Sequence, residues 1–166
     1  QNSEKDDKER KFTQSSENQE NISFIKDSYL QYNRIDPNKR FDNFITSTSN
    51  KLAYEASLKV TENFTNYNPL YVYAGVGMGK THLLNSIGLE LKKTNTVLFI
   101  SAERFMYQFV KSIKANDMVK FKEYFRNTEV LLIDDIQFMN GKEAMQEEFF
   151  HTFNALLEKG AQIIMS

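Results

Sequence analysis

Short apolar runs alternate with amphipathic stretches over most of the chain. Four of these runs have the length and the β-branched or aromatic content of buried strands. They are LYVYA (70–74), TVLFIS (96–101), VLLID (130–134) and QIIMS (162–166). Helical periodicity fills the intervals, at 51–63, 80–93, 103–115, 117–126 and 143–160. Strands without polar alternation are covered on both faces, so this order predicts an α/β fold with an open parallel sheet flanked by helices.

Two of these helices allow finer predictions. In the helix at 51–63, Ser47 or Ser49 is available as the N-cap. Its apolar positions recur on one face, which we expect to be buried: Leu52, Ala56 and Val60. The helix at 143–160 has a stronger apolar side and ends at a glycine suited to a C-cap. These positions are Met145, Phe149, Phe153 and Leu156, with Gly160 at the end.

The first 35 residues have a different character. They begin QNSEKDDKERKFTQSSENQEN, a mixture of charged and polar residues with isolated apolar positions. Such a composition buries too little surface to offset the entropy of ordering, so we predict a disordered polar linker at 1–35. Within it, ISFIKDSYLQY (22–32) could instead form a transient helix or a docking motif. The folded region is expected to begin at residue 36.

The composition excludes several classes of protein. The chain has no cysteine, which rules out a disulfide framework and a thiolate metal site. No apolar run reaches the roughly 18 residues that a membrane helix needs, so we expect a soluble, cytoplasmic protein. The formal net charge of −1 gives no global sign of nucleic-acid binding, and any such surface must be local.

Three of the six glycines of the chain occupy alternate positions between the first strand and the next helix. They are Gly75, Gly77 and Gly79. Glycine reaches positive φ and lets backbone N–H groups approach a polyphosphate without a Cβ in the way. The helix that follows would direct its unpaired N–H groups and the positive end of its dipole at the same anion. This stretch therefore predicts a phosphate-binding loop.

The residues after the last glycine fit the nucleotide-binding pattern G-x-x-x-x-G-K-[ST]. Lys80 would reach the β- and γ-phosphates and assist catalysis, and the Thr81 hydroxyl would ligate Mg²⁺. The first glycine position of the pattern holds Ala74, and alanine can occupy it at negative φ. Met78 and His82 complete the residues expected to contact ATP or ADP.

Two consecutive acids end the third apolar run. A buried strand of this kind places Asp134 beside the phosphate loop, where P-loop enzymes hold Mg²⁺. Asp135 follows at the carboxyl edge of the sheet, where ligands bind in open α/β folds. Asp135 is therefore the candidate general base that polarises an attacking water.

Longer motifs point to a family. They are FDNF (41–44), SNKLAYEA (49–56), YNPLYVY (67–73), GVGMGKTHLL (75–84), SAERF (101–105), LLIDDIQF (131–138) and QEEFFHTFNALLEKGAQII (146–164). In these motifs the chain resembles the DnaA family of bacterial chromosomal replication initiators, which are AAA+ ATPases. The resemblance runs from about residue 36 to the end and implies a P-loop fold of the AAA+ type. The residues before 36 correspond to the variable linker of that family.

The resemblance also implies partners. Family members bind ATP, assemble with copies of themselves on the chromosomal origin in the ATP state and melt duplex DNA. The replicative helicase and acidic phospholipids are further implied partners. Single-stranded DNA would be gripped by Val110 and Lys111, with Lys142 as a further basic contact, while Ala144 stands where the family commonly has arginine. The residues themselves allow two interpretations of KSIKANDMVKFKEYFR (111–126): a basic and aromatic track for a single strand, or an ordinary amphipathic helix with solvated lysines.

The sequence stops at Ser166, inside the fourth strand. Sheets of the resembled family have the strand order 5-1-4-3-2, so we expect the strand at 70–74 to be an exposed edge. We also expect marginal stability, slow ATP hydrolysis and no specific recognition of duplex origin DNA, which belongs to a C-terminal domain outside this sequence. Two other classes stay open: a related AAA+ helicase loader or initiator regulator, and a small-molecule phosphotransferase. DNA-stimulated ATP hydrolysis would distinguish an initiator from a phosphotransferase.

Overall fold

A computed structural model describes residues 35–64 and 67–166. The linker predicted at 1–35 and the alternative interpretations of 22–32 therefore fall almost wholly outside the described residues. At the start of the described part, Ile35 packs against buried apolar side chains of the folded region. No helix of the described residues is long and apolar enough to cross a membrane.

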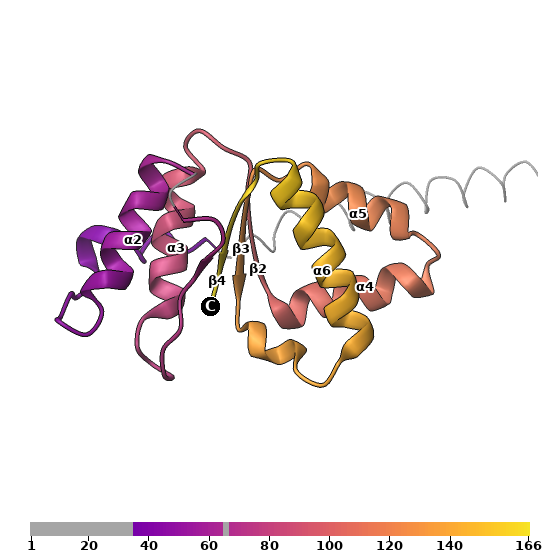
Figure 1. The fold of residues 1–166 in the computed structure, drawn as a ribbon, viewed down its shortest axis with the longest axis horizontal. Coiled ribbons are helices and arrows are strands. Elements are labelled where there is room, and N and C mark those ends of the chain that lie inside the picture. The colour runs from indigo at the N-terminus through magenta and orange to yellow at the C-terminus, as the bar shows by residue number, and fades with distance from the viewer. Residues whose placement is uncertain (1–34, 65–66) are drawn as a thin grey trace, which may run out of the picture. The chain divides into compact units, whose positions relative to one another are not determined.

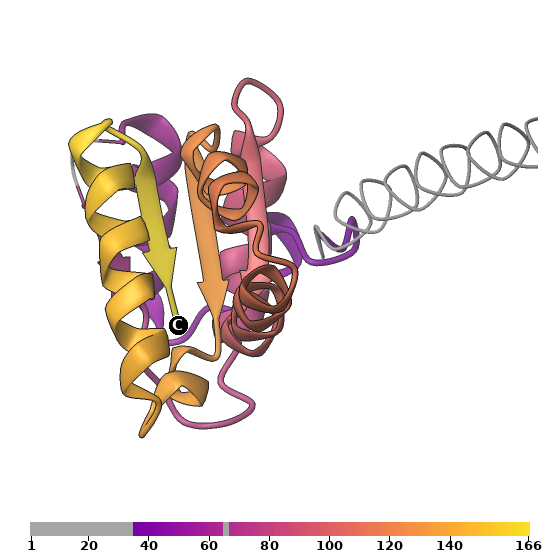
Figure 2. The same ribbon diagram turned by 90° about the vertical axis from the view of Figure 1, so that its right-hand side faces the viewer.

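The centre of the fold is a parallel four-stranded sheet with the order β1–β4–β3–β2. Its strands are β1 (Leu70–Tyr71), β2 (Val97–Ser101), β3 (Val130–Asp134) and β4 (Gln162–Met165). The helices are η1 (Phe41–Asn43), α2 (Lys51–Glu62), α3 (Lys80–Leu91), α4 (Ala102–Lys114), α5 (Met118–Arg126), η2 (Ile136–Met139) and α6 (Glu143–Glu158). Figures 1 and 2 show α2 and α3 on one side of the sheet and α4, α5 and α6 on the other. The predicted α/β fold with a parallel sheet is confirmed.

Both faces of the central strands are buried, because successive side chains of a strand point to opposite faces. In β3, Leu131 and Ile133 pack with the α4–α6 side, while Val130 and Leu132 pack with the α2–α3 side. The neighbouring strand β2 divides its apolar residues in the same way. This explains why these strands read as continuous apolar runs in the sequence.

Strand β1 is shorter than the predicted 70–74. Its ladder to β4 consists of two residue pairs and a further hydrogen bond of 2.8 Å from the Val72 N–H to the Met165 carbonyl. Beyond it the backbone leaves the sheet, and the side chain of Tyr73 is 85% exposed. Strand β1 lies at the edge of the sheet, as expected.

The N-terminus and the buried face of α2 differ from the predictions. Asn50 occupies the N-cap position, whereas the hydroxyls of Ser47 and Ser49 bond to each other at 2.9 Å. Leu52 is 80% exposed, so its predicted burial is wrong. The buried face includes Ser57, whose hydroxyl donates to the Ala53 carbonyl at 2.7 Å and is thereby satisfied inside the core. A buried serine shifts the face by one position relative to the apolar pattern.

The predicted apolar side of α6 is confirmed. Met145, Phe149 and Leu156 are buried, and Phe153 is partly buried against them. Gly160 follows the end of the helix with φ of 82°, the left-handed conformation that favours glycine at this place.

Candidate nucleotide-binding site

The loop between β1 and α3 depends on two glycines with positive φ. Gly77 has φ of 76° and Gly79 has φ of 88°, values that other residues rarely adopt. A Cβ added at Gly79 would also lie 2.9 Å from Cε2 of Phe44, whereas one added at Gly77 would meet nothing within 4 Å. Gly77 is therefore required by the backbone alone, and Gly79 by the backbone and by a neighbouring ring.

Lys80 begins α3 and turns back over the loop. Its Nζ donates to the carbonyl of Ala74 at 2.9 Å and to that of Gly75 at 3.1 Å. Alanine at the first position of the pattern thus supplies the same main-chain acceptor that glycine would. These bonds hold a positive charge at the beginning of the loop, beside the exposed glycines.

Thr81 and Asp134 lie 53 residues apart in the chain and meet directly. The Thr81 hydroxyl donates to Oδ2 of Asp134 at 2.6 Å. The other carboxylate oxygen accepts from the Asp135 N–H at 3.0 Å and from the Ser166 hydroxyl. Asp134 is only 7% exposed, and this set of hydrogen bonds fixes its orientation. A hydroxyl and a carboxylate in contact are the oxygen donors that Mg²⁺ uses in P-loop proteins.

No cluster of three or more metal-ligating side chains occurs in the part of the chain that the structure describes. An ion held by Thr81 and Asp134 would take its remaining ligands from phosphate oxygens and water, as Mg²⁺ commonly does. Thr81 and Asp134 alone are too few to bind a metal ion without a nucleotide. They therefore suit the Mg²⁺ predicted from the sequence, which a bound nucleotide would also hold.

Asp135 differs from Asp134 in every respect that bears on its role. It adopts φ of 57°, and its exposed side chain accepts a hydrogen bond from Nε2 of Gln137 at 3.0 Å. It lies just past the carboxyl end of β3, as expected. Its function as a general base stays a prediction.

Met78 and His82 lie in different surroundings. Met78 is 53% exposed within the loop. The Nε2 of His82 lies 2.8 Å from the Arg40 carbonyl, and the ring makes an edge contact with Phe44. The His82 carbonyl accepts from the Ser86 hydroxyl at 2.8 Å, and contact of His82 with a nucleotide stays a prediction.

A polar clamp beneath the loop was not predicted from the sequence. Asn85, on α3, is 1% exposed. Its Oδ1 accepts from the Asp36 N–H at 2.7 Å, and its Nδ2 donates to the carbonyls of Asp36 and Lys39 at 2.6 and 2.9 Å. An asparagine within the apolar LLNSIG was the available signal. The clamp joins the segment that carries Phe44 to the helix that carries Lys80 and Thr81.

Asp36 lies where the chain enters the clamp. The hydrogen bond from the Asn38 N–H lowers the pKa of Asp36, an effect that the ion pair with Lys39 supports. The carboxylate of Asp36 is therefore charged at neutral pH, at the place where the chain enters the clamp.

The residues predicted to contact DNA lie on α4 and at the N-cap of α6. Val110 is 41% exposed on α4 and is followed by the half-buried Lys111. Lys142 stands at the N-cap of α6, where its Nζ donates to the Phe138 carbonyl at 2.7 Å and lies 4.3 Å from the centre of the Phe138 ring. Val110 is thus exposed, while Lys111 and Lys142 are only half-buried, and their contact with a single strand stays a prediction.

The aromatic track proposed at 111–126 is only partly available. Phe121 and Phe125 are 5% and 1% exposed and belong to the core, so they cannot stack on bases. For these two residues the interpretation as an ordinary amphipathic helix is correct. The lysines of the stretch remain on the surface.

Comparison with known proteins identifies the family. The model of the bacterial DnaA ATPase domain matches residues 35–166. The chain belongs to this family. It is 48% identical over 141 residues to the chromosomal replication initiator protein DnaA of Rickettsia canadensis, covering 81% of this chain and 30% of that protein. This membership agrees with the resemblance in the sequence and leaves the phosphotransferase and loader interpretations without support.

Two solved DnaA structures have the same fold. One is a replication initiator DnaA bound to AMPPCP and single-stranded DNA, with a TM-score of 0.77 and 40% identity over 80% of this chain and 42% of that chain. The other is AMPPCP-bound DnaA from Aquifex aeolicus, with a TM-score of 0.76, 40% identity and the same coverage. The chain therefore spans less than half of each of these two DnaA chains.

Proposed function

We propose that this chain is the nucleotide-binding part of a replication initiator. It binds ATP or ADP with Mg²⁺ at the loop from Gly75 to Thr81, and in the complete protein this binding controls assembly on the chromosomal origin. Asp134 and Thr81 hold the metal, and Lys80 neutralises the β- and γ-phosphates.

One observation carries the proposal most directly. The glycine loop, the Lys80 ammonium and the Thr81–Asp134 pair lie together at the carboxyl edge of a parallel sheet, as phosphate binding requires. The related DnaA bound to AMPPCP, an ATP analogue, supports the same ligand class for this chain.

Calorimetry with ATP and ADP tests the proposal. We expect Mg²⁺-dependent binding by the unmodified chain and a loss of at least about tenfold in affinity for Lys80→Ala, because a charge-assisted contact to phosphate is removed. Lys92→Ala, at the exposed end of the same helix, is the matched control and should bind normally. Equal affinity of the Lys80→Ala variant and the unmodified chain would sink the proposal.

The same proposal includes single-stranded DNA as a partner through Val110, Lys111 and Lys142, by analogy with the related DnaA that binds it. Self-assembly in the ATP state, contact with the replicative helicase, association with acidic phospholipids and a cytoplasmic location follow from the family resemblance. Duplex origin recognition is assigned to other parts of the complete protein.

A further inference from the structure

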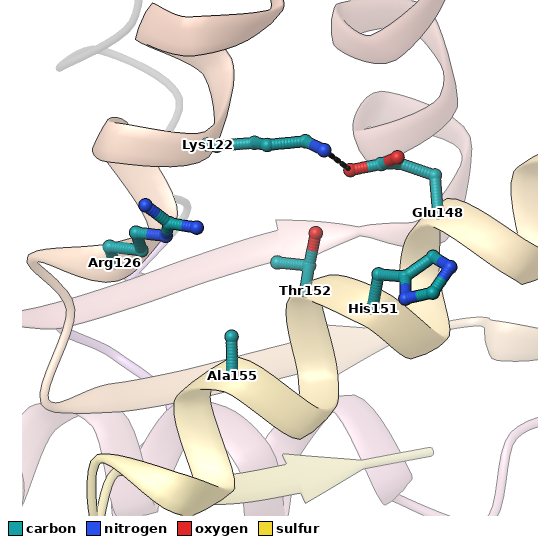
Figure 3. A pocket seen from close by; sticks show the side chains of 6 residues that line it. All are labelled: Lys122, Arg126, Glu148, His151, Thr152 and Ala155. Carbon is teal, nitrogen blue, oxygen red and sulfur yellow. Dashed lines mark ion pairs between the residues drawn. The ribbon is translucent and has the colours of Figure 1, made fainter.

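A small pocket lies between α5 and α6, on the face of the sheet opposite α3. Its volume is about 60 Å³, several times the roughly 10–15 Å³ that admits one water. Figure 3 shows Lys122 and Arg126 from α5 and Glu148 and Thr152 from α6 directed toward the same space. None of these residues belongs to the nucleotide loop or is one of the predicted DNA contacts Val110, Lys111 and Lys142, although Lys122 and Arg126 lie within 111–126, which one interpretation assigns to a single-strand track. Ala155 forms part of the wall and, being small, leaves the space open.

The α6 wall presents oxygens without hydrogen-bond partners among the described residues. Thr152 is 8% exposed, and its Oγ1 is buried without a partner. Oε1 of Glu148 is also buried without one: it lies 3.4 Å from Nζ of Lys122, an ion-pair distance that lacks hydrogen-bond geometry. Buried oxygens left in this state are costly, since each loses its bonds to water on folding. The wall therefore has capacity for a ligand that both accepts and donates hydrogen bonds.

The α5 wall supplies donors in excess. Lys122 and Arg126 are four residues apart, so both side chains extend from one face of the helix. Lys122 has one ion pair, with Glu148, and no carboxylate of the described residues lies within ion-pair distance of the Arg126 guanidinium. Lys159 adds a third positive charge nearby by donating to the Arg126 carbonyl. His151, at the rim, is largely exposed, with its Nε2 3.9 Å from the exposed Glu147 carboxylate.

We propose that this pocket binds inorganic phosphate in a protonated form. The Arg126 guanidinium, Lys122 and the Thr152 hydroxyl donate to phosphate oxygens, and the P–OH group donates to Oε1 of Glu148. A carboxylate in an anion site repels fully deprotonated ions, so Glu148 selects an oxyanion that still carries a proton. Sulfate at neutral pH has no such proton, and neither has the phosphodiester of DNA. A phosphomonoester has lost its last proton above about pH 6 and is disfavoured at pH 7.5.

The test uses site-resolved NMR of the 166-residue chain, because phosphate could also enter the nucleotide loop. We expect millimolar phosphate at pH 7.5 to shift the Arg126 Nε–Hε signal and the Thr152 amide signal in a saturable way. Sulfate and phosphoserine at equal ionic strength should bind about tenfold more weakly, the loss expected for one hydrogen bond to a charged group. Unmoved Arg126 and Thr152 signals, or equal shifts with phosphate and sulfate, would overturn the proposal.

Variants separate the roles of the two walls. Arg126→Gln should abolish saturable binding, while Lys120→Gln, the same charge change on the exposed side of α5, should preserve it. Glu148→Gln should bring sulfate affinity to within a few-fold of phosphate affinity, because the amide can donate to an unprotonated oxygen. Thr152→Val, which is nearly isosteric, should weaken phosphate binding without unfolding the chain. Retained selectivity for phosphate in Glu148→Gln would contradict the assigned role of the carboxylate.

Discussion

On the α4–α6 side of the sheet, the ring of Phe105 touches those of Phe121, Phe125 and Phe149 at centroid distances of 5.4, 5.1 and 5.6 Å. On the α3 side, the important contacts are directional: Asn85 holds the segment at 36–39, and Lys80 folds over its own loop. Packing by rings tolerates small shifts and supplies most of the stability, whereas hydrogen bonds fix positions but add little net energy. Both sides bury an apolar cluster, but only the α3 side adds the directional contacts that position the candidate site. Variants on the α4–α6 side should mainly lower the stability of the fold, whereas variants on the α3 side should mainly disturb the candidate site.

The largest effect is expected from the ring cluster. Phe125→Ala removes a side chain that is 1% exposed and should lower the free energy of unfolding by about 3–5 kcal/mol. Phe150→Ala, on α6 and 58% exposed, makes the same deletion at the surface and should cost less than about 0.5 kcal/mol. Urea unfolding measures both. If the two variants lost equal stability, the assignment of stability to the ring cluster would be wrong.

A smaller effect is expected at the loop. Gly79→Ala and Gly77→Ala both force alanine to positive φ, at about 1–2 kcal/mol each. Gly79→Ala should cost about 1 kcal/mol more and weaken ATP binding further, because its Cβ meets Phe44. Phe44→Leu replaces the colliding ring by a smaller side chain. It should restore the additional stability lost in Gly79→Ala and should have no such effect in Gly77→Ala. A double-mutant cycle in urea unfolding tests this coupling, and a cycle with no coupling for Gly79 would show that backbone strain is the whole effect.

The sequence predicted the parts of the site that depend on strand order and spacing. A strand that ends in acids must deliver Asp134 to the same sheet edge as the loop, and Thr81 lies within hydrogen-bond reach of it. The sequence could not predict contacts that form only when segments distant in the chain pack together. The Asn85 clamp and the Phe44 ring against Gly79 are of this kind. In each case a local pattern of one helix or loop does not specify what lies against it.

The face of α2 shows the same limit within the fold. Leu52 fits the apolar period, yet the helix buries Ser57 because its hydroxyl finds a carbonyl acceptor four residues earlier. The N-cap also differs: it is Asn50 in place of the predicted serines, and its Oδ1 accepts from the Ser47 N–H. By contrast, the strand at 130–134 lies where its apolar run predicts it, since burial on both faces leaves no choice of register.

The clamp itself gives the next prediction. Asn85→Ala leaves the Asp36 N–H without its partner and removes one of the two bonds to each of the Asp36 and Lys39 carbonyls, so it should lower the free energy of unfolding by about 1–3 kcal/mol. The sharper readout is local: hydrogen exchange of the Asp36 amide should speed up far more than that of Leu132 in the sheet. Asn127→Ala removes an exposed amide and serves as the control. Unchanged protection at Asp36 would mean that the segment is held by Phe41 and Phe44 instead.

The smallest effect is expected from changes at the predicted DNA contacts. Lys111, on α4, and Lys142, at the N-cap of α6, are on the same side of the sheet as the ring cluster but do not belong to it. Lys111→Gln and Lys142→Gln should each reduce the salt dependence of single-strand binding by about 0.7 in log–log slope, as expected for one phosphate contact. Each should change the midpoint of urea unfolding far less than Phe125→Ala does, because both lysines are only half-buried. Lys93→Gln, which removes an exposed charge paired with Glu90 on the α3 side, should leave the slope unchanged. If it lowers the slope equally, binding reflects overall charge and not a track over α4 and α6. If only Lys142→Gln reduces the slope, Lys142 makes the phosphate contact. Phe138 already restrains this side chain, so it loses less conformational freedom on binding.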